Sequence, residues 1–211
     1  MYLIQFYETD KAYGCFSNFS RHSVEMDGVL WLTSEHFFQA AKFTREADVH
    51  AVLAAPTPFA AAQIGRDRQR SFREDWDNIR DGVMLRTLEA KFTQHTDLKE
   101  ILLSTTGAHL VEHTRNDKYW GDGGDGSGRN MLGYLLEQIR AKLGPVGSKW
   151  CPPPWVQGPG IDRSDMYWRM GKGEEQLSTA SRFREELSPA ARAHYDMYFP
   201  APVEWSAPWS T

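Results

Sequence analysis

The sequence predicts an α+β fold that is predominantly α-helical, arranged as a single compact domain with a small N-terminal strand and hairpin element and an extended C-terminal tail. Three observations lead to this prediction. Most short β-leaning runs lie before residue 34, helical periodicity dominates from there to residue 143, and prolines and glycines interrupt the chain from residue 144 onward. With 211 residues, 41% of them hydrophobic and 25% charged, the chain can bury a core and carry an appendage.

A strand and a hairpin are expected at the N-terminus. Residues 2–7, with the sequence YLIQFY, form a short apolar run of the kind found in strands. In HSVEMDGVLWLT, residues 22–33, Asp27 and Gly28 stand between two β-leaning runs. An Asp-Gly pair readily takes the positive φ angles of a tight turn, so this segment predicts a β-hairpin.

At Ser34 the spacing of apolar residues changes from the alternation of a strand to the pattern of a helix. We expect the helix that begins with SEHFFQAAKF to reach about residue 45. Thr33 or Ser34 is the expected N-cap, and Glu35 lies in the first turn, where negative charge is favourable. A second, short helix begins with Pro58 at its first helical position and ends at Gly65.

The main core helix is predicted at residues 75–92, DWDNIRDGVMLRTLEAKF, because apolar side chains recur along one of its faces. The members of this stripe are Ile79, Val83, Met84, Leu88 and Phe92. Two further helices are expected at residues 96–105 and 130–143, with a short strand, HLVEHT, at residues 109–114.

Prolines and glycines such as those of GPVGSKWCPPPWVQGPG, residues 144–160, cannot continue a helix, so we expect a boundary after residue 143. Residues 1–143 then form the main domain, and residues 144–211 form an extension rich in Pro, Gly and Trp. One helix is predicted in the extension, at residues 181–199, broken or restarted at Pro189. Five tryptophans are expected to hold the extended chain against the body: Trp150, Trp155, Trp168, Trp205 and Trp209.

The composition argues against several classes of protein. A net charge of −4 and a pI near 6.0 give no overall basic surface for nucleic acid. Cys15 and Cys151 are too few for a disulfide framework and lack the spacing of a zinc or redox motif. The seven histidines are scattered without metal-ligand spacing, so we expect no metal and no cofactor. The first residues show neither a long apolar run nor a signal-peptide pattern, so we expect no membrane partner and a cytoplasmic protein.

The first predicted helix carries a candidate functional face. Glu35, Gln39 and Lys42 are spaced i, i+4 and i+7 and therefore project from the same side. The same placement suits the helix dipole on any exposed helix, since Glu lies in the first turn and Lys near the last. The flanking Phe38 and Ala41 and the neighbouring hairpin favour the wall of a pocket.

Arginines occupy alternate positions in GRDRQR, residues 65–70, just after the second helix. In an extended segment, Arg66, Arg68 and Arg70 would share one side and could bind a phosphate through their guanidinium groups. A solvated loop that offsets nearby acidic residues explains the pattern equally well.

The loop NDKYWGDGGDGSGRN, residues 116–130, contains five glycines and must need unusual backbone angles or close backbone approach if it is ordered. It lacks the Walker A pattern and the glutamate that an EF-hand needs at its twelfth position. It retains a carboxylate, Asp117, close to an indole, Trp120, with Asn130 at the start of the next helix. A carboxylate can stabilise an oxocarbenium-like sugar and an indole can stack on its ring, so the loop predicts a sugar site. Gly121 and its fellow glycines would let the backbone approach a sugar phosphate.

Several separate motifs together resemble the YbiA-like (NADAR) family. In chain order they are FYETDKAYGCFSNFS, DGVLWLTSEHFFQAAKF, IGRDRQRSFREDW, and the segment from LEAKF to GYLL at residues 88–136. The resemblance covers residues 3–143 and implies a mostly α-helical N-glycosidase domain. It also implies a substrate class. Members of the family hydrolyse the C1′–N bond of early ribosylamino-pyrimidine 5′-phosphates of riboflavin synthesis, and others remove ADP-ribose from guanine bases.

The resemblance places Glu35, Lys42 and Asp117 in catalytic motifs. The resemblance and the sequence patterns together give the expected substrate-binding residues. These are Asn18, Gln39, Arg66, Trp76, Trp120, Gly121 and Asn130. Cleavage of a ribosyl C–N bond must relieve charge at C1′ and supply a proton to the leaving amine, so Glu35 and Asp117 are expected to share these roles. Lys42, with its pKa lowered by aromatic neighbours, is expected to hold C1′ as a transient Schiff base.

Three functions follow as hypotheses. The first is hydrolysis of a small ribosyl phosphate, with Arg66 binding the phosphate and Trp76 and Trp120 enclosing the heterocycle or ribose. The second is removal of ADP-ribose from guanine in nucleic acid, which a few arginines and stacking rings could bind. The third is a non-enzymatic module that senses nucleotides or binds a protein through its tryptophan-rich tail.

Overall fold

The computed structural model describes residues 2–144 and 149–206. Its strands are β1 (Tyr2–Phe6), β2 (Val24–Met26), β3 (Val29–Trp31) and β4 (Ala108–Glu112). Its α-helices are α1 (Ser34–Ala40), α2 (Glu46–Leu53), α3 (Pro58–Ile64), α4 (Trp76–Gln94), α5 (Thr96–Ser104), α6 (Met131–Leu143), α7 (Pro154–Gln157), α8 (Gly171–Glu186) and α9 (Pro189–Tyr198). The predominantly α-helical α+β class is confirmed.

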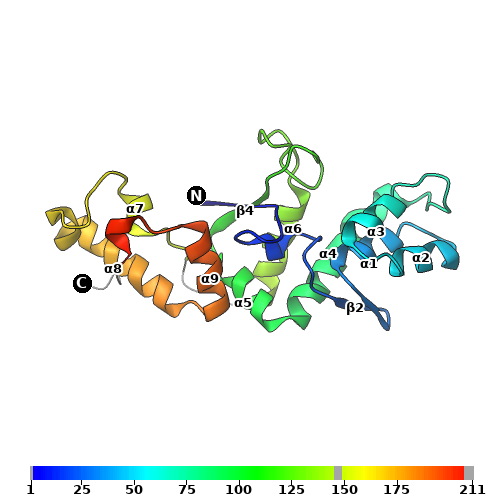
Figure 1. The fold of residues 1–211 in the computed structure, drawn as a ribbon, viewed down its shortest axis with the longest axis horizontal. Coiled ribbons are helices and arrows are strands. Elements are labelled where there is room, and N and C mark those ends of the chain that lie inside the picture. The colour runs from blue at the N-terminus through cyan, green and yellow to red at the C-terminus, as the bar shows by residue number, and fades with distance from the viewer. Residues whose placement is uncertain (1, 145–148, 207–211) are drawn as a thin grey trace.

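The elements are arranged in three parts along the longest axis of the molecule (Figure 1). Helices α1, α2 and α3 lie at one end with the β2–β3 hairpin, and α4, α5 and α6 form the middle beside β4. Helix α8 lies at the other end, and α9 packs against α5. Among the described residues, no helix is both long and apolar enough to span a membrane.

Each of the two small sheets contains two strands. In the hairpin of β2 and β3, Asp27 and Gly28 have φ angles of 53° and 78°, which confirms the predicted turn. Strand β1 pairs in parallel with β4, with Tyr2 opposite Ala108 and Phe6 opposite Glu112. Both strands were expected, but their pairing was not, because no local pattern links segments so distant in the chain.

Helix α1 is shorter than predicted. Thr33 caps it by accepting a hydrogen bond from the backbone N–H of His36, as expected, but the helix ends at Ala40 rather than near residue 45. Phe43 then forms an isolated antiparallel bridge with Phe72, and this non-local pairing draws the chain out of the helix. The separate helix α2, which begins after this bridge, was not predicted.

The other helices of the main domain follow the sequence closely. Helix α3 has Pro58 in its first turn and Gly65 at its C-cap, as predicted. The stripe on α4 also behaves as predicted, since Met84, Leu88 and Phe92 are fully buried. These side chains share one core with β1, β4 and α6, whereas the hairpin and helices α1–α3 enclose a second core.

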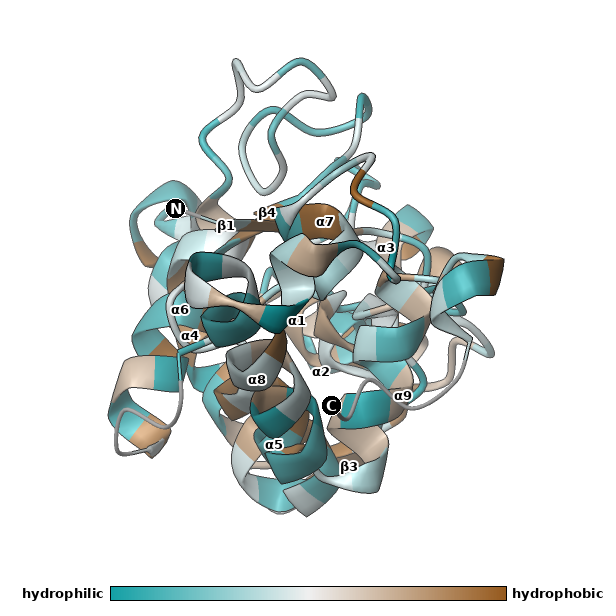
Figure 2. Cartoon of the chain, turned by 90° about the vertical axis from the view of Figure 1, so that its left-hand side faces the viewer, coloured by the Kyte–Doolittle hydropathy of each residue, from teal (hydrophilic) through white to brown (hydrophobic). Residues whose placement is uncertain are grey.

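The C-terminal extension contains more helix than predicted. The expected helix at residues 181–199 is two helices, because α8 already begins at Gly171 and the chain is extended at Leu187. Ser188 caps α9 and Pro189 opens it, since proline is well tolerated in a first helical turn. In Figure 2, α8 carries both hydrophobic and hydrophilic residues, as expected of a helix packed on one face.

The tail is held against the body by buried rings and hydrogen bonds. Trp150 enters the main core, and His194 Nδ1 accepts a hydrogen bond from the backbone N–H of Tyr13 at 2.8 Å. Trp155 and Trp168 instead pack against Trp205 in a separate cluster. The predicted clamp therefore applies to Trp150, whereas Trp209 lies outside the described residues.

Helix α6 packs directly against β4 at Gly133. A Cβ atom at this position would lie 2.0 Å from the carbonyl oxygen of Leu110 and 2.5 Å from Nδ2 of Asn130. Neither neighbour is the end of a flexible chain, since one is strand backbone and the other is hydrogen-bonded to that backbone. The contact requires a residue without a side chain.

We expect Gly133→Ala to destabilise the protein by about 1–3 kcal/mol, because the added methyl group overpacks the interface between α6 and β4. Gly82→Ala is the matched control. Gly82 lies in the middle of α4 with open space around its Cβ position, so alanine should stabilise by about 0.5–1 kcal/mol. Chemical denaturation of both variants measures the effects. Equal midpoints for Gly133→Ala and the wild type would contradict the proposed packing.

Candidate active site

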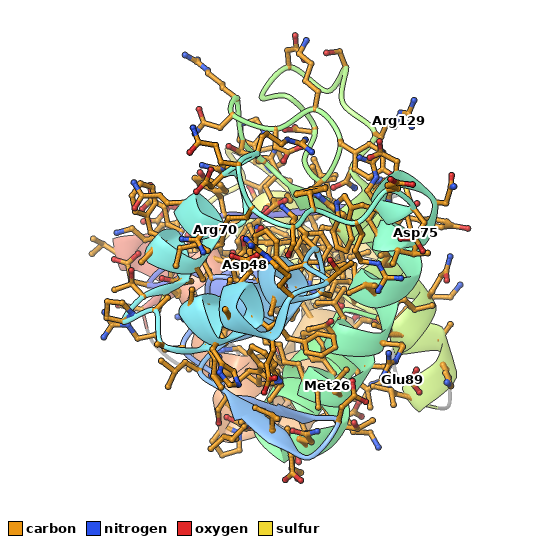
Figure 3. The ribbon with its side chains drawn as sticks, turned by 90° about the vertical axis from the view of Figure 1, so that its right-hand side faces the viewer. Met26, Asp48, Arg70, Asp75, Glu89 and Arg129 are labelled. Carbon is orange, nitrogen blue, oxygen red and sulfur yellow. The ribbon has the colours of Figure 1, made fainter. Side chains whose placement is uncertain are left out.

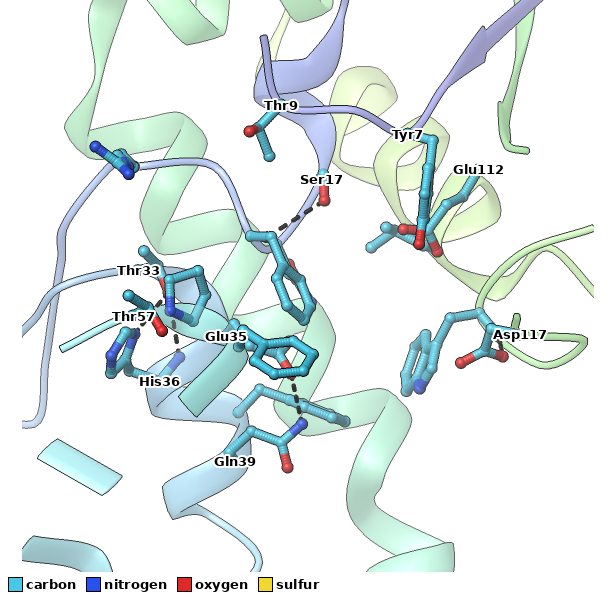
Figure 4. Close-up of a pocket in the computed structure, with 18 of the residues that line it drawn as sticks. Tyr7, Thr9, Ser17, Thr33, Glu35, His36, Gln39, Thr57, Glu112 and Asp117 are labelled. Carbon is cyan, nitrogen blue, oxygen red and sulfur yellow. Dashed lines mark hydrogen bonds between the residues drawn. The ribbon is translucent and has the colours of Figure 1, made fainter. Parts of the chain in front are cut away.

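A cavity of about 990 Å³ lies between helix α1, the loops after β1 and the segment after β4 (Figure 4). Seven of the ten predicted site residues line it: Asn18, Glu35, Gln39, Lys42, Arg66, Asp117 and Trp120. Trp76, Gly121 and Asn130 are not among the residues that line it. The fold thus brings together candidate residues from distant parts of the chain.

Glu35 is buried in the first turn of α1 and is 5% exposed. Its Oε1 accepts a hydrogen bond from Nε2 of Gln39 at 2.5 Å, one helical turn away (Figure 4). Burial raises the pKa of Glu35 to about 6, although the Gln39 hydrogen bond and the charge of Lys42 act in the opposite direction. A carboxyl with this pKa can take up or release a proton near neutral pH, as acid–base catalysis requires.

Lys42 lies just beyond the end of α1, among aromatic rings. Its Nζ donates a hydrogen bond to the carbonyl of Gly65 at 3.2 Å and lies 5.6 Å from the ring centroids of Phe38 and Trp76. Burial lowers the pKa of Lys42 to about 8, while the carboxylate of Glu35 opposes this shift. A fraction of the amine is therefore neutral near physiological pH, and the neutral amine is the nucleophilic form.

Two amide oxygens at the cavity, Oδ1 of Asn18 and Oε1 of Gln39, are buried without a hydrogen-bond partner among the described residues. The amide nitrogens of both side chains are engaged, with Nδ2 of Asn18 donating to Sδ of Met84 at 2.8 Å and Nε2 of Gln39 donating to Glu35. Buried acceptors are normally satisfied. Both oxygens are themselves buried, and that of Gln39 lies against Gly65, so a ligand can reach either only if the side chain turns.

Lys91, a fully buried residue of α4, holds the loop that carries Asn18. Its Nζ donates to the carbonyl oxygens of Cys15 at 2.5 Å and Ser17 at 3.0 Å, and to Oγ of Ser20 at 2.6 Å. Burial lowers its pKa to about 8. Because all three donors of the ammonium group are used, Lys91 fixes this wall of the cavity and is not free to bind a ligand.

The three alternate arginines do not share one side of the chain. Arg66 lines the cavity, Arg68 lies over the ring of Phe72 at 4.2 Å, and Arg70 forms an ion pair with Asp48 at 3.0 Å (Figure 3). The segment is a series of turns rather than an extended strand, so alternate side chains diverge. The predicted three-arginine phosphate site is therefore reduced to Arg66.

The expected pair of tryptophans does not enclose an open space. Trp76 and Trp120 both pack edge-on against Phe38, at centroid distances of 5.0 and 5.4 Å. Trp120 lines the cavity, whereas Trp76 is 6% exposed and lies behind Phe38 and Lys42. A ligand ring would have to displace Phe38 to lie between the tryptophans, so the predicted sandwich is not formed.

Asp117 has a structural task besides its place in the cavity wall. Its Oδ1 accepts hydrogen bonds from the backbone N–H groups of Tyr119 at 2.7 Å and Trp120 at 2.8 Å. This turn sets the direction of the Trp120 ring. Its other carboxylate oxygen, Oδ2, makes no hydrogen bond with a described residue and remains available to a ligand.

Gly121 and Asn130 contact the neighbouring strand instead of the cavity. Asn130 Oδ1 accepts a hydrogen bond from the N–H of Glu112 at 2.9 Å, and its Nδ2 donates to the carbonyl of Leu110 at 2.7 Å. A Cβ atom at Gly121 would lie 2.8 Å from the carbonyl oxygen of Glu112. The predicted substrate contacts of these two residues are therefore replaced by contacts with the backbone of β4.

Glu112, the last residue of β4, lines the cavity and was not predicted as a site residue. Burial first, and then the nearby carboxylates of Asp117, Glu35 and Asp122, together raise its pKa to about 8. One signal in the sequence could have found it. An acidic residue ends an otherwise apolar strand directly before the candidate loop.

Within residues 2–144 and 149–206, no group of three or more His, Cys, Asp or Glu side chains is arranged to hold a metal ion. Besides hydroxyl groups and the imidazole of His36, which is hydrogen-bonded to Thr33 and to the carbonyl of Ala55, the cavity offers carboxyl groups, one amine, amides and guanidinium groups. Such a set can move protons, attack an electrophilic carbon and bind a phosphate.

Comparison with known proteins assigns the chain to a family. Residues 5–144 match the model of the NADAR domain family. The chain belongs to the NADAR family. It is 48% identical over 141 residues to N-glycosidase YbiA of Escherichia coli, covering 67% of this chain and 88% of that protein. The NMR structure of the same Escherichia coli protein superposes with a TM-score of 0.64, covering 67% of this chain and 84% of that one.

A plant relative extends the comparison. Riboflavin biosynthesis protein PYRR, chloroplastic, of Zea mays is 40% identical over 156 residues, which cover 67% of this chain and 25% of that protein. The prediction of a NADAR-family enzyme of the N-glycosidase class is confirmed. The division at residue 143 and the roles of individual site residues stay predictions.

Glu112 should make stability depend on pH. Its raised pKa means that the folded protein holds this proton above the ordinary pKa of 4.5, so the associated stability is complete below pH 4.5 and lost as the pH rises through about 8. Glutamine resembles the protonated carboxyl and does not titrate. We therefore expect the melting temperature of Glu112→Gln, relative to that of the wild type, to increase as the pH rises from about 5 to about 9. Thermal unfolding measures it. For the control Glu100→Gln, on the exposed side of α5, the difference in melting temperature from the wild type should be the same at every pH. A pH-independent difference for Glu112→Gln would contradict the raised pKa of Glu112.

Proposed function

We propose that this chain hydrolyses the C1′–N bond between a ribose 5′-phosphate and an amino-pyrimidine, with early ribosylamino-pyrimidine phosphates of riboflavin synthesis as substrates. The observation that carries the proposal is Lys42, an amine with a lowered pKa among aromatic rings and close to the buried carboxyl of Glu35. The relative from Zea mays that is named a riboflavin biosynthesis protein supports the choice of substrate.

The proposed reaction begins with attack of the neutral Lys42 amine on C1′. Glu35 accepts the proton that the amine releases, and Asp117 offers negative charge to the electron-poor C1′. The sugar then stays on Lys42 as an amine adduct in equilibrium with a Schiff base until water releases it. In this proposal Arg66, which is exposed and lines the cavity, binds the 5′-phosphate.

A second candidate function is removal of ADP-ribose from guanine. The volume of the cavity, about 990 Å³, favours it, because this lies at the upper end of the range for ligand sites in proteins. Arg21 adds a second guanidinium group to the lining besides Arg66, and an ADP-ribose group carries two phosphates. Both candidates use the same bond type and the same proposed nucleophile.

Reduction with borohydride during turnover should link the ribose phosphate covalently to Lys42, and mass spectrometry of the peptide containing Lys42 would detect it. Lys42→Arg keeps the charge but cannot form a Schiff base, so we expect no adduct and a loss of at least about 100-fold in kcat. Lys172→Arg, on the exposed side of α8, is the control and should retain both adduct formation at Lys42 and the wild-type kcat. A wild type without adduct, combined with a Lys42→Ala variant of normal rate, would rule out the covalent step.

The two substrate classes can be separated directly. We expect the wild type to hydrolyse an aminopyrimidine riboside 5′-phosphate with a higher kcat/KM than a guanine oligonucleotide that carries ADP-ribose. A side-by-side assay of released base or amine measures the ratio. The reverse ratio would favour the second candidate. Absence of both activities in a folded protein that still binds either ligand would indicate a non-enzymatic module.

A further inference from the structure

Glu112 differs from Glu35 and Asp117 because its carboxyl group is not engaged, and from Glu8, which also lines the cavity, because Glu8 is exposed. Glu35 accepts a hydrogen bond from Gln39, and Asp117 accepts two from the backbone of its own loop. With the residues that the structure describes, the Glu112 carboxyl forms neither a hydrogen bond nor an ion pair. Glu112 and Tyr7 both line the cavity (Figure 4), and the proton of the Glu112 carboxyl is not committed to an acceptor among the described residues.

The backbone of Glu112 is fixed from several directions. Its N–H donates to Asn130 Oδ1 at 2.9 Å, and its carbonyl accepts a hydrogen bond from the N–H of Asp122 at 3.0 Å. Phe6 of β1 is its partner in the parallel pairing. Gly121 lies so close to this carbonyl that it has no room for a Cβ atom. The glycine-rich loop thus folds onto Glu112, and a fixed backbone limits where its carboxyl can reach.

The surroundings of Glu112 favour the protonated form. The titratable groups around it are Tyr7 and Glu8 after β1, Glu35 of α1, Asp117 and Asp122 of the loop, and its chain neighbour His113, whose Nδ1 pairs with Asp122 at 2.7 Å. The positive charges of Lys42 and Arg66 lower the pKa of Glu35, whereas the shift of Glu112 is caused by burial and by carboxylates. Burial and three carboxylates therefore keep the pKa of Glu112 at about 8, so it carries a proton at neutral pH.

We propose that Glu112 is the acid that protonates the leaving amine, an inference that rests on the function proposed above. Two carboxyl groups with separated environments then take opposite roles in one cavity, with Glu112 supplying a proton and Glu35 accepting one. The third carboxyl group, that of Asp117, stabilises charge at C1′.

The proton transfers balance over the whole reaction. In the first step, the Lys42 nitrogen bonds to C1′ and gives a proton to the Glu35 carboxylate. The C1′–N bond breaks, and the leaving nitrogen keeps the electron pair and takes the proton of Glu112. In the second step, water bonds to C1′ and gives a proton to the Glu112 carboxylate, while the Lys42 nitrogen leaves with the proton of Glu35. Both carboxyl groups return to their starting states, and the net reaction adds one water.

The test compares two leaving groups in Glu112→Gln, which keeps the shape of the protonated acid but cannot give up a proton. The substrates are the aminopyrimidine riboside 5′-phosphate and its 5-nitro analogue, whose less basic leaving amine depends less on protonation. We expect kcat to fall by about 100-fold or more on the first substrate and by less than about 10-fold on the second. Wild-type activity on the first substrate should rise as Lys42 loses its proton and decline above about pH 8 as Glu112 loses its own, whereas Glu112→Gln should keep the rise and lack the decline.

Three controls separate the outcomes. Asp125→Asn removes a carboxylate from the exposed part of the same loop and should leave both rates unchanged. Glu112→Asp keeps an acid on the same backbone and should retain the alkaline decline at a lower rate. Equal losses on the two substrates, or an unchanged pH profile in Glu112→Gln, would overturn the role of Glu112 while the proposed function stands. A wild type that cleaves neither pyrimidine would overturn the proposed function itself.

Discussion

The site depends on the parallel pairing of β1 with β4. This pairing sets Phe6 opposite Glu112, so the chain that leaves β1 and the chain that leaves β4 begin side by side and form two walls of the cavity. Helix α6 packs against the same strand at Gly133, and the tail closes the other side of the sheet through Tyr198, whose hydroxyl bonds to the backbone of β1. A parallel pair needs a long connection, and here that connection contains every helix that lines the cavity except α6.

Burial of charge then separates the chemistry of the groups that this pairing brings together. Glu35 and Glu112 are both carboxyl groups, yet Glu35 lies close to a lysine and an amide donor whereas Glu112 faces other carboxylates. Lys42 and Lys91 are both lysines with pKa values near 8, yet the ammonium group of Lys91 is fully hydrogen-bonded inside the protein. The neighbours of each side chain, rather than its type, decide whether it can react or only support the structure.

The glycine-rich loop illustrates how far sequence reasoning reached. Its density of glycine correctly indicated close backbone approach, and Asp117 and Trp120 do line the cavity. The loop backbone approaches another part of the protein rather than a ligand, however, because Gly121 packs on the carbonyl of Glu112. Asn130 also supports this strand through its side chain. A sequence can indicate that a backbone must come close to something, but the partner is chosen by the packing of the whole chain.

The sequence by itself determined the features that depend on neighbouring residues. These are the Asp27–Gly28 turn, the cap at Thr33 and the helical spacing that joins Glu35 to Gln39, because turns, caps and one-turn contacts arise within a few residues. The family motifs likewise identified the enzyme class. Tertiary structure alone decided the pairing of β1 with β4, the early end of α1 at the Phe43–Phe72 bridge, the packing of Phe38 against both tryptophans and the entry of Trp150 into the main core. Each of these joins segments that are distant in sequence, and no local pattern specifies which distant segment will become the neighbour.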